Sequence, residues 1–164
     1  MATTAFTGHS LPPISDTRTD LVRPHRTADR RSQHRAGSGN LARVAAQWTT
    51  LVIDAQDPES LASFWAAALR WDRHPTDPTD GSVVVADPDR RLPILLFLPT
   101  QETKARKNRV HLDVNPMGCD QQEELERLVG LGAREVDIGQ RSTAWVVLAD
   151  PEGNEFCLLQ RRLD

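Results

Sequence analysis

The chain has 164 residues, of which 38% are hydrophobic, and its formal net charge is -3. This length and composition suit one domain with a tail rather than two domains. The charge is uneven: residues 1–45 hold seven Arg against three Asp, which leaves a net charge of -7 on the remainder. An acidic domain without a basic, aromatic stripe repels phosphate backbones, so we expect no nucleic-acid partner.

No apolar run approaches the roughly 20 residues that span a bilayer, and the N-terminus lacks the apolar region of a secretory signal. We therefore expect no membrane partner. Cys119 and Cys157 stand far apart, without a C-x-x-C pair. This spacing suits a reducing compartment and argues against a disulfide framework, so the expected location is the cytoplasm.

Residues 1–45 are rich in Thr, Ser, Arg, Pro and Gly and show neither helical nor strand periodicity. Such a segment buries too little apolar surface to offset the entropy of ordering, so we predict a disordered N-terminal tail. A targeting peptide, an anion-binding arm and an overlong start-codon assignment remain alternatives for this segment.

The predicted domain spans residues 46–164 and opens with a β-branched strand at 48–53. Asp57 then suits a helix N-cap, and Pro58 is tolerated at the first helical position. The apolar residues that follow at helical spacing are Leu61, Phe64 or Trp65, Ala68 and Leu69. This helix should therefore pack one face on a sheet.

A polar loop follows Trp71, and strands are predicted at about 82–87 and 92–98. The second half repeats this order. A strand at 109–114 precedes a helix that Asp120 and Glu123 begin with a capping-box pattern and that Gly132 ends.

Strands at about 134–138, 143–149 and 154–160 close the second half, with a tight turn at 150–154. Corresponding residues of the halves lie about 62 positions apart, which indicates an internal duplication. The predicted fold is α+β, with two βαβββ modules at about 48–100 and 108–160.

Several short motifs together resemble glyoxalase-like domains of the vicinal oxygen chelate superfamily, which includes glyoxalases, bleomycin resistance proteins and dioxygenases. The resemblance covers roughly residues 48–160. It is carried by Asp57-Pro58 with Phe64-Trp65, by Asn108-Arg109-Val110-His111-Leu112-Asp113, by Leu131-Gly132-Ala133, and by Asp150-Pro151-Glu152-Gly153-Asn154-Glu155-Phe156. It implies paired modules forming a curled mixed sheet around a cleft. Enzymes of this kind hold a divalent metal there, as a Lewis acid for two neighbouring substrate oxygens.

The resemblance places three metal-ligand positions at Thr50, His111 and Cys157. Thr50 is a weak donor whose usual role in a strand is packing. Cys157 could bind zinc as a thiolate or serve as a small buried hydrophobe, and His111 could be a ligand or a core histidine. Glu155 shares the strand face of Cys157 and could replace the missing carboxylate, or it could be a solvated hairpin residue.

Two carboxylates are candidates for catalysis. Asp113 lies two residues beyond His111, so both side chains share a strand face, where Asp113 could orient the imidazole or act in acid–base chemistry. Its alternative role is local hydrogen bonding at a strand end. Glu155 is the second candidate.

The candidate ligand-binding residues are Thr50, Trp65, Arg109, His111 and Trp145. Trp65, Trp71 and Trp145 could line an aromatic pocket, or Trp65 could belong to the core face of the helix and Trp145 to a strand. Arg109 could bind an anionic substrate or be an exposed strand-end residue. Arg70 stands where such domains commonly have Gly after the helix, which leaves the form of that turn open.

We favour a glyoxalase-like protein whose cleft binds a small molecule and whose metal binding is weak or absent, as in the bleomycin-resistance branch. The alternative is a metal-dependent lyase, isomerase or dioxygenase acting on a small oxygen-rich substrate. A divalent ion is the one cofactor that the resemblance suggests. Catalysis, a homodimeric state and a purely structural role are left open by the sequence.

Overall fold

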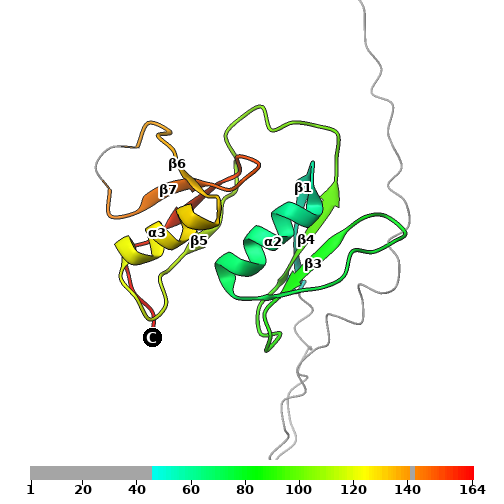
Figure 1. Cartoon of the computed structure of the whole chain (residues 1–164), viewed down its shortest axis with the longest axis horizontal. Coiled ribbons are helices and arrows are strands. Elements are labelled where there is room, and N and C mark those ends of the chain that lie inside the picture. Colours follow the sequence, from blue (N-terminus) through cyan, green and yellow to red (C-terminus); the bar gives the residue numbers. More distant parts are fainter. Residues whose placement is uncertain (1–45, 141–142) are drawn as a thin grey trace, which may run out of the picture. The chain divides into compact units, whose positions relative to one another are not determined.

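The computed structural model describes residues 46–140 and 143–164, so the predicted tail lies outside the described residues. Residues 48–164 form one compact unit. In this unit the elements follow one another as two βαβββ modules, each with a helix beside its own sheet (Figure 1).

The first module contains β1 (Thr50–Ala55), α2 (Pro58–Leu69), β2 (Asp72–Arg73), β3 (Val83–Ala86) and β4 (Ile94–Pro99). Its strands form a four-stranded sheet in the order β1-β4-β3-β2. The β1 and β4 strands are parallel, whereas β3 runs antiparallel to both β4 and β2.

The second module contains β5 (Asp113–Val114), α3 (Gln121–Leu131), β6 (Arg134–Glu135), β7 (Val146–Ala149) and β8 (Glu155–Leu158). Its sheet has the matching order β5-β8-β7-β6. The predicted α+β class and the duplicated module are confirmed. The strands are divided between two mixed sheets that do not close into one.

Local capping explains where the helices begin and end. The Asp57 carboxylate accepts a hydrogen bond from the Ser60 backbone N–H at the start of α2. At α3, Asp120 and Glu123 form the predicted capping box, and Gly132 ends the helix in the left-handed region at φ 116°. Arg70 takes the same left-handed conformation after α2, with φ 55°, so the turn forms there without Gly.

Two predicted segments of the sheets need correction. The strand expected at 109–114 pairs only over Asp113–Val114, and just before the predicted strand the Asn108 N–H donates to the Glu155 carboxylate. Asp72–Arg73 forms a short edge strand where a polar loop was predicted. Two exposed polar residues carry no alternating apolar signal, so periodicity could not find this strand.

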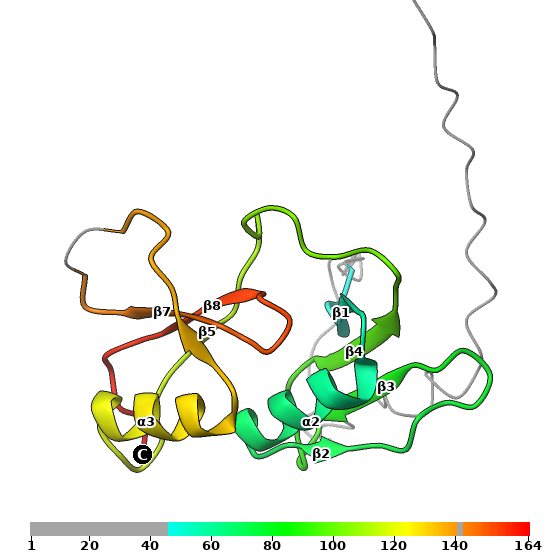
Figure 2. The same cartoon turned by 45° about the horizontal axis from the view of Figure 1, so that its top comes forward.

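One core serves both modules. The Trp65 ring of α2 lies 5.1 Å, centroid to centroid, from Phe156 of β8, and both belong to the same buried cluster. The Trp65 Nε1–H donates to the buried Asp150 carboxylate at 3.1 Å. Arg127 of α3 donates to the carbonyl oxygens of Ala67 and Ala68 in the last turn of α2, and the two helices lie end to end in Figure 2.

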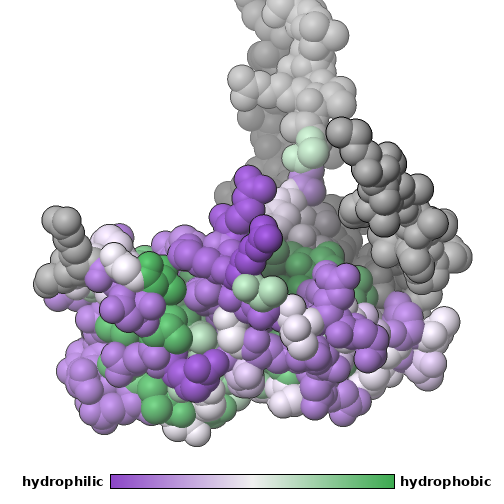
Figure 3. Space-filling model, turned by 90° about the horizontal axis from the view of Figure 1, so that it is seen from above, coloured by the Kyte–Doolittle hydropathy of each residue, from purple (hydrophilic) through white to green (hydrophobic). Residues whose placement is uncertain are grey.

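Polar side chains are prominent on one face of the molecule. Hydrophilic residues cover much of the face shown in Figure 3, with apolar side chains in smaller patches. Within the described part of the chain, no helix has the length and apolar character needed to cross a membrane.

Candidate functional site

A cluster of three potential metal ligands lies on β5, β8 and the segment just before β5. In the parallel pairing of these strands Asp113 lies opposite Cys157. His111 precedes Asp113 by two residues, and its Nε2 lies 3.4 Å from the Asp113 Oδ1. One ligand atom each from His111, Asp113 and Cys157 lies within 4.8 Å of the other two. The structure therefore brings His111 and Cys157 together and adds Asp113 to them.

The thiol of this cluster is buried, whereas its neighbours are open to solvent. Cys157 is 7% exposed, and the side chains of His111 and Asp113 are 42% and 52% exposed. Burial raises the pKa of Cys157, and the charge of Asp113 and a hydrogen bond with it raise that pKa further. The free thiol therefore keeps its proton, which disfavours a nucleophilic cysteine because such chemistry needs a thiolate.

Glu155 lies on the same strand as Cys157 but is held by other groups. Its carboxylate accepts hydrogen bonds from Lys104 Nζ at 2.8 Å and from the Asn108 N–H at 2.9 Å. Burial alone would raise the pKa of Glu155, but these two bonds, a hydrogen bond with its own backbone and the charge of Lys104 together lower the pKa below its usual value. Glu155 is thus an ionised anchor for the 104–108 segment and is not in the three-donor group.

A cavity of about 360 Å³ lies beside this cluster, between β1, the segment from residue 100 to 112 and the last hairpin. Apolar side chains form part of its wall, including Leu51, Ile53 and Phe156. The lining also includes His111, Glu155 and two polar residues, Lys104 and Asn108. The sequence analysis did not name Lys104, and it gave Asn108 only as part of a family motif and not as a cavity residue. The one local signal for Lys104 was the basic run just before the His111 segment.

A second cavity, of about 400 Å³, is more aromatic. Its lining includes three indoles, from Trp48, Trp65 and Trp71, together with Asp113. Leu51, Leu112 and Phe156 line both cavities. Because His111 lines the first and Asp113 the second, the cluster stands at the boundary between them.

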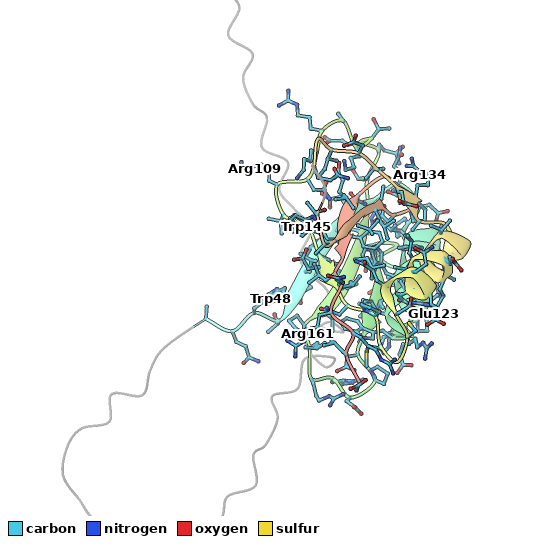
Figure 4. All side chains as sticks on the ribbon, turned by 90° about the vertical axis from the view of Figure 1, so that its left-hand side faces the viewer. Trp48, Arg109, Glu123, Arg134, Trp145 and Arg161 are labelled. Atoms are coloured by element: carbon cyan, nitrogen blue, oxygen red, sulfur yellow. The ribbon has the colours of Figure 1, made fainter. Side chains whose placement is uncertain are left out.

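Three predicted ligand-binding residues line neither of these cavities. Thr50 is half-buried and pairs with Ile94 in the first sheet. Trp145 is 44% exposed and precedes β7 rather than lying in it. Arg109 is exposed on an outer loop (Figure 4).

The donor chemistry decides which ion the cluster fits. Imidazole, carboxylate and thiolate are all zinc ligands, and three of them with one open side resemble a catalytic zinc set. The three-strand set that the resemblance implies would instead need a ligand from β1, where Thr50 offers only a neutral hydroxyl. His111, Asp113 and Cys157 are thus the described residues that fit a divalent ion.

Several solved structures share this fold. A possible glyoxalase from Bacillus cereus is 16% identical, with a TM-score of 0.53, and the match covers 70% of this chain and 99% of that one. A glyoxalase-related enzyme from Fulvimarina pelagi is 17% identical, with a TM-score of 0.50 and coverage of 70% and 87%.

A third structure is a variant of the fosfomycin resistance protein FosX from Listeria monocytogenes, complexed with Mn(II) and 1S,2S-dihydroxypropylphosphonic acid. It is 10% identical, with a TM-score of 0.52 and coverage of 71% and 90%. At these identities the likeness concerns the fold alone. A comparison with curated protein sequences found no match.

The sequence profile of the family described as "Glyoxalase-like domain" matches residues 50–159. The match begins at β1 and ends just beyond β8, so it takes in both modules and the three-donor cluster. Because it covers more than half of the chain, this protein belongs to the glyoxalase-like domain family.

Proposed function

We propose that this protein binds a small organic molecule in the 360 Å³ cavity beside His111. The observation that carries the proposal is the make-up of this cavity, which combines apolar walls with a few polar groups. Small-molecule sites have this composition and a volume in this range, from about 300 to 1,000 Å³.

The polar groups of the cavity differ in their freedom to contact a ligand. Lys104 is engaged by Glu155, with a distance of 2.8 Å between Nζ and Oε1, so its charge is already balanced. The His111 imidazole is 42% exposed and has Asp113 on one side. We therefore assign His111 the main polar contact with the ligand, and the apolar wall most of the contact area.

Hard divalent ions such as Mn²⁺ should bind this cavity weakly or not at all. These ions prefer carboxylate, carbonyl and water oxygens. Glu155 already accepts two hydrogen bonds, and Thr50 offers only a neutral hydroxyl. Ligand binding should accordingly persist after treatment with a chelator.

A second candidate function is a metal-dependent lyase, isomerase or dioxygenase. It is favoured by the convergence of His111, Asp113 and Cys157 and by the fold shared with the Mn(II)-bound structure. A bound metal would supply Lewis-acid stabilisation of charge on substrate oxygens. In this case Asp113 would orient the His111 ring, and the open side of the cluster would admit the substrate.

A cavity-filling variant tests the first proposal. We would screen a library of small molecules against chelator-treated protein by thermal shift and measure the hits by calorimetry. Val52 lines the cavity and is 50% exposed, so Val52→Trp should occupy the space and abolish binding. Val129→Trp is the matched control, because Val129 is 45% exposed on α3 and lines neither cavity.

The results separate the two functions. Hits that bind the wild type and Val129→Trp but not Val52→Trp support the proposed cavity. Hits that bind all three proteins alike would place the ligand elsewhere. Turnover of a hit that requires added metal would establish the second function instead.

A further inference from the structure

We propose that the 400 Å³ cavity lined by three indoles is a second ligand site, which binds a flat aromatic ring that carries an acid group. The ring contacts Trp48 and Trp71, and the acid group pairs with Arg70. None of these three residues lines the cavity beside His111. This site therefore stands apart from the proposed function, and either can fail its test without the other.

The two cavities meet at a shared apolar wall. Leu51, Leu112 and Phe156 line both of them. From this wall the second cavity extends to the last turn of α2, to the loop between β3 and β4, and to the C-terminal residues. Apart from the shared wall, a ligand there contacts a surface that the first cavity does not offer.

Exposed apolar side chains gather around the second cavity. They have exposed fractions from 38% to 67% and are Trp48, Leu92, Met117 and Leu163. Single exposed apolar residues are ordinary, but a contiguous group of them marks a binding site. Because these four line one cavity, they favour a ligand with a large apolar surface.

Hydrogen bonds hold part of this apolar rim in place. The Gly118 N–H donates to the Leu163 oxygen at 3.0 Å, and the Leu163 N–H donates to the Pro116 oxygen at 2.8 Å. The side-chain amide of Asn115 donates to the Arg161 oxygen at 2.6 Å. The C-terminal residues are thus fixed beside the loop before α3. A wall that is already ordered costs less entropy when a ligand binds.

The indoles that a ligand can reach are those of Trp48 and Trp71. Trp65 also lines the cavity, but it is 2% exposed and belongs to the core. The Trp48 Nε1–H donates to the Thr50 carbonyl oxygen at 3.1 Å, so this indole needs no polar partner from a ligand. Aromatic side chains pair favourably with other rings. The expected ligand therefore contains a flat aromatic ring.

The charged residues of the cavity indicate where an acid group would bind. They are Arg70, Asp113, Glu124 and Arg127. Glu124 and Arg127 neutralise each other through two hydrogen bonds of 2.7 Å. Asp113 stands at the boundary with the first cavity and would repel an anion. Among the residues that the structure describes, Arg70 has no ion-pair partner, so the acid group is placed there.

The backbone of Arg70 supports a role for its side chain. This residue is exposed and lies in the left-handed region at φ 55°, which disfavours any residue with a Cβ. Gly would fit this turn without strain, so the turn itself does not require Arg. Strained residues of this kind gather at functional sites. A favourable interaction with the C-terminal dipole of α2 is the competing explanation, and it predicts a different result below.

The test uses two probes that differ only in charge, naphthylacetate and its neutral amide. Each is titrated by calorimetry, at low salt, into the full-length protein after treatment with a chelator. Both should bind through the ring. The acid should bind about fivefold more tightly than the amide, which is the effect of one exposed ion pair.

Matched variants assign the contacts. Arg70→Gln should remove the preference for the acid and leave amide binding unchanged, whereas Arg109→Gln, at an exposed position outside both cavities, should change neither. Trp48→Ala should weaken both probes by up to about tenfold, as loss of an aromatic contact does. Trp145→Ala is its control, because Trp145 lines neither cavity. Val52→Trp, which fills the first cavity, should leave both affinities unchanged.

Arg70→Gly separates ligand binding from a purely structural role. Because Gly relieves the left-handed strain, this variant should be no less stable to heat than the wild type, yet it should lose the preference for the acid. Lower stability with an unchanged preference would mean that Arg70 serves the helix end, which would overturn the assignment of the acid group.

Three further results would overturn the site. The first is that the wild type binds neither probe. The second is that Val52→Trp abolishes binding, which would place the probes in the first cavity. The third is a dimer, seen by sedimentation, that Trp48→Ala dissociates and that the probes leave intact, because a second copy would then cover these residues. The screen for ligands of the first cavity is unaffected by the first and third results.

Discussion

At the residue scale, Trp65 links the two modules through both its ring and its N–H. The ring makes edge contacts with Phe64 and Phe156, at centroid distances of 5.4 and 5.1 Å. The residue is 2% exposed, and its Nε1–H bonds to Asp150. These contacts identify Trp65 as a core residue that also forms part of the wall of the aromatic cavity.

Trp65→Ala should therefore be severe. Removing a buried aromatic side chain and leaving a cavity costs about 3 to 5 kcal/mol of unfolding free energy. Trp145→Ala is the control, because Trp145 is 44% exposed and should change stability by no more than about 0.5 kcal/mol. Urea unfolding monitored by circular dichroism measures both. Equal, small effects would mean that Trp65 is not part of the folding core.

Asp150 is a fully buried carboxylate at the start of the last hairpin turn. It accepts hydrogen bonds from Trp65, from the backbone of Glu152, and from both the backbone and the side chain of Asn154. Burial raises the pKa of Asp150, and these hydrogen bonds offset only part of that increase. The folded protein therefore holds a proton on Asp150 more tightly than the unfolded chain does.

This pKa difference predicts the sign of a pH effect. Because the pKa is higher in the folded state, the contribution of Asp150 to stability should fall as pH rises from about 4, the ordinary Asp value, through the raised folded value. Asp150→Asn does not titrate, so it isolates this contribution. Unfolding free energies measured across that window should show the wild type losing stability relative to the variant. A pH-independent difference between the two proteins would contradict the assignment.

At the element scale, the helices were predictable because their ends depend on local residues. Asp57 caps α2 and the pair of Asp120 and Glu123 caps α3, as the sequence indicates. The shorter strands depend on distant partners. The ladder of β5 covers only two residues, and the backbone at Asn108 before it is bound by the carboxylate of Glu155, which is distant in the sequence. No pattern within a single strand carries that information.

The candidate site, too, could be predicted from the sequence only in part. Strand alternation predicts that His111 and Asp113 share a face, and they lie 3.4 Å apart. The position of Cys157 opposite Asp113 depends on the register of β5 against β8, which sequence periodicity does not specify. Counting from the family motifs suggested Thr50 as a third member. The described cluster contains Asp113 in its place because that residue is the direct ladder partner of Cys157.

The start of α2 is stabilised by a residue from the other module. The Glu152 carboxylate accepts hydrogen bonds from the N–H groups of Gln56 and Asp57, at 2.9 and 2.8 Å. Glu152→Ala should lower the unfolding free energy by about 1 kcal/mol and speed hydrogen exchange at these two amides. Glu102→Ala is the control, since Glu102 is exposed and makes no such bond. Unchanged exchange at Gln56 and Asp57 would refute this role.

At the scale of the whole molecule, the two modules depend on each other. The buried cluster includes Leu61 and Trp65 of α2 together with Leu128 of α3 and Phe156 of β8. Hydrogen bonds also join the two modules. Asp150 accepts one from the Trp65 N–H, and Arg127 donates one to the last turn of α2. Neither module therefore keeps a complete set of partners when it is alone.

A fragment of residues 46–105 should consequently fail to fold. It would expose the aromatic face of α2 that Phe156 covers and would lose the Asp150 acceptor of the Trp65 N–H. Burying one side of a sheet or helix against a partner is what makes such a layer stable, so we expect an unfolded or aggregated product. Amide NMR spectra decide the matter, with residues 46–164 as the control, because the described core lies within them. Dispersed signals from the shorter fragment would show that the first module is an independent folding unit, and the shared core would then be an association of two preformed halves.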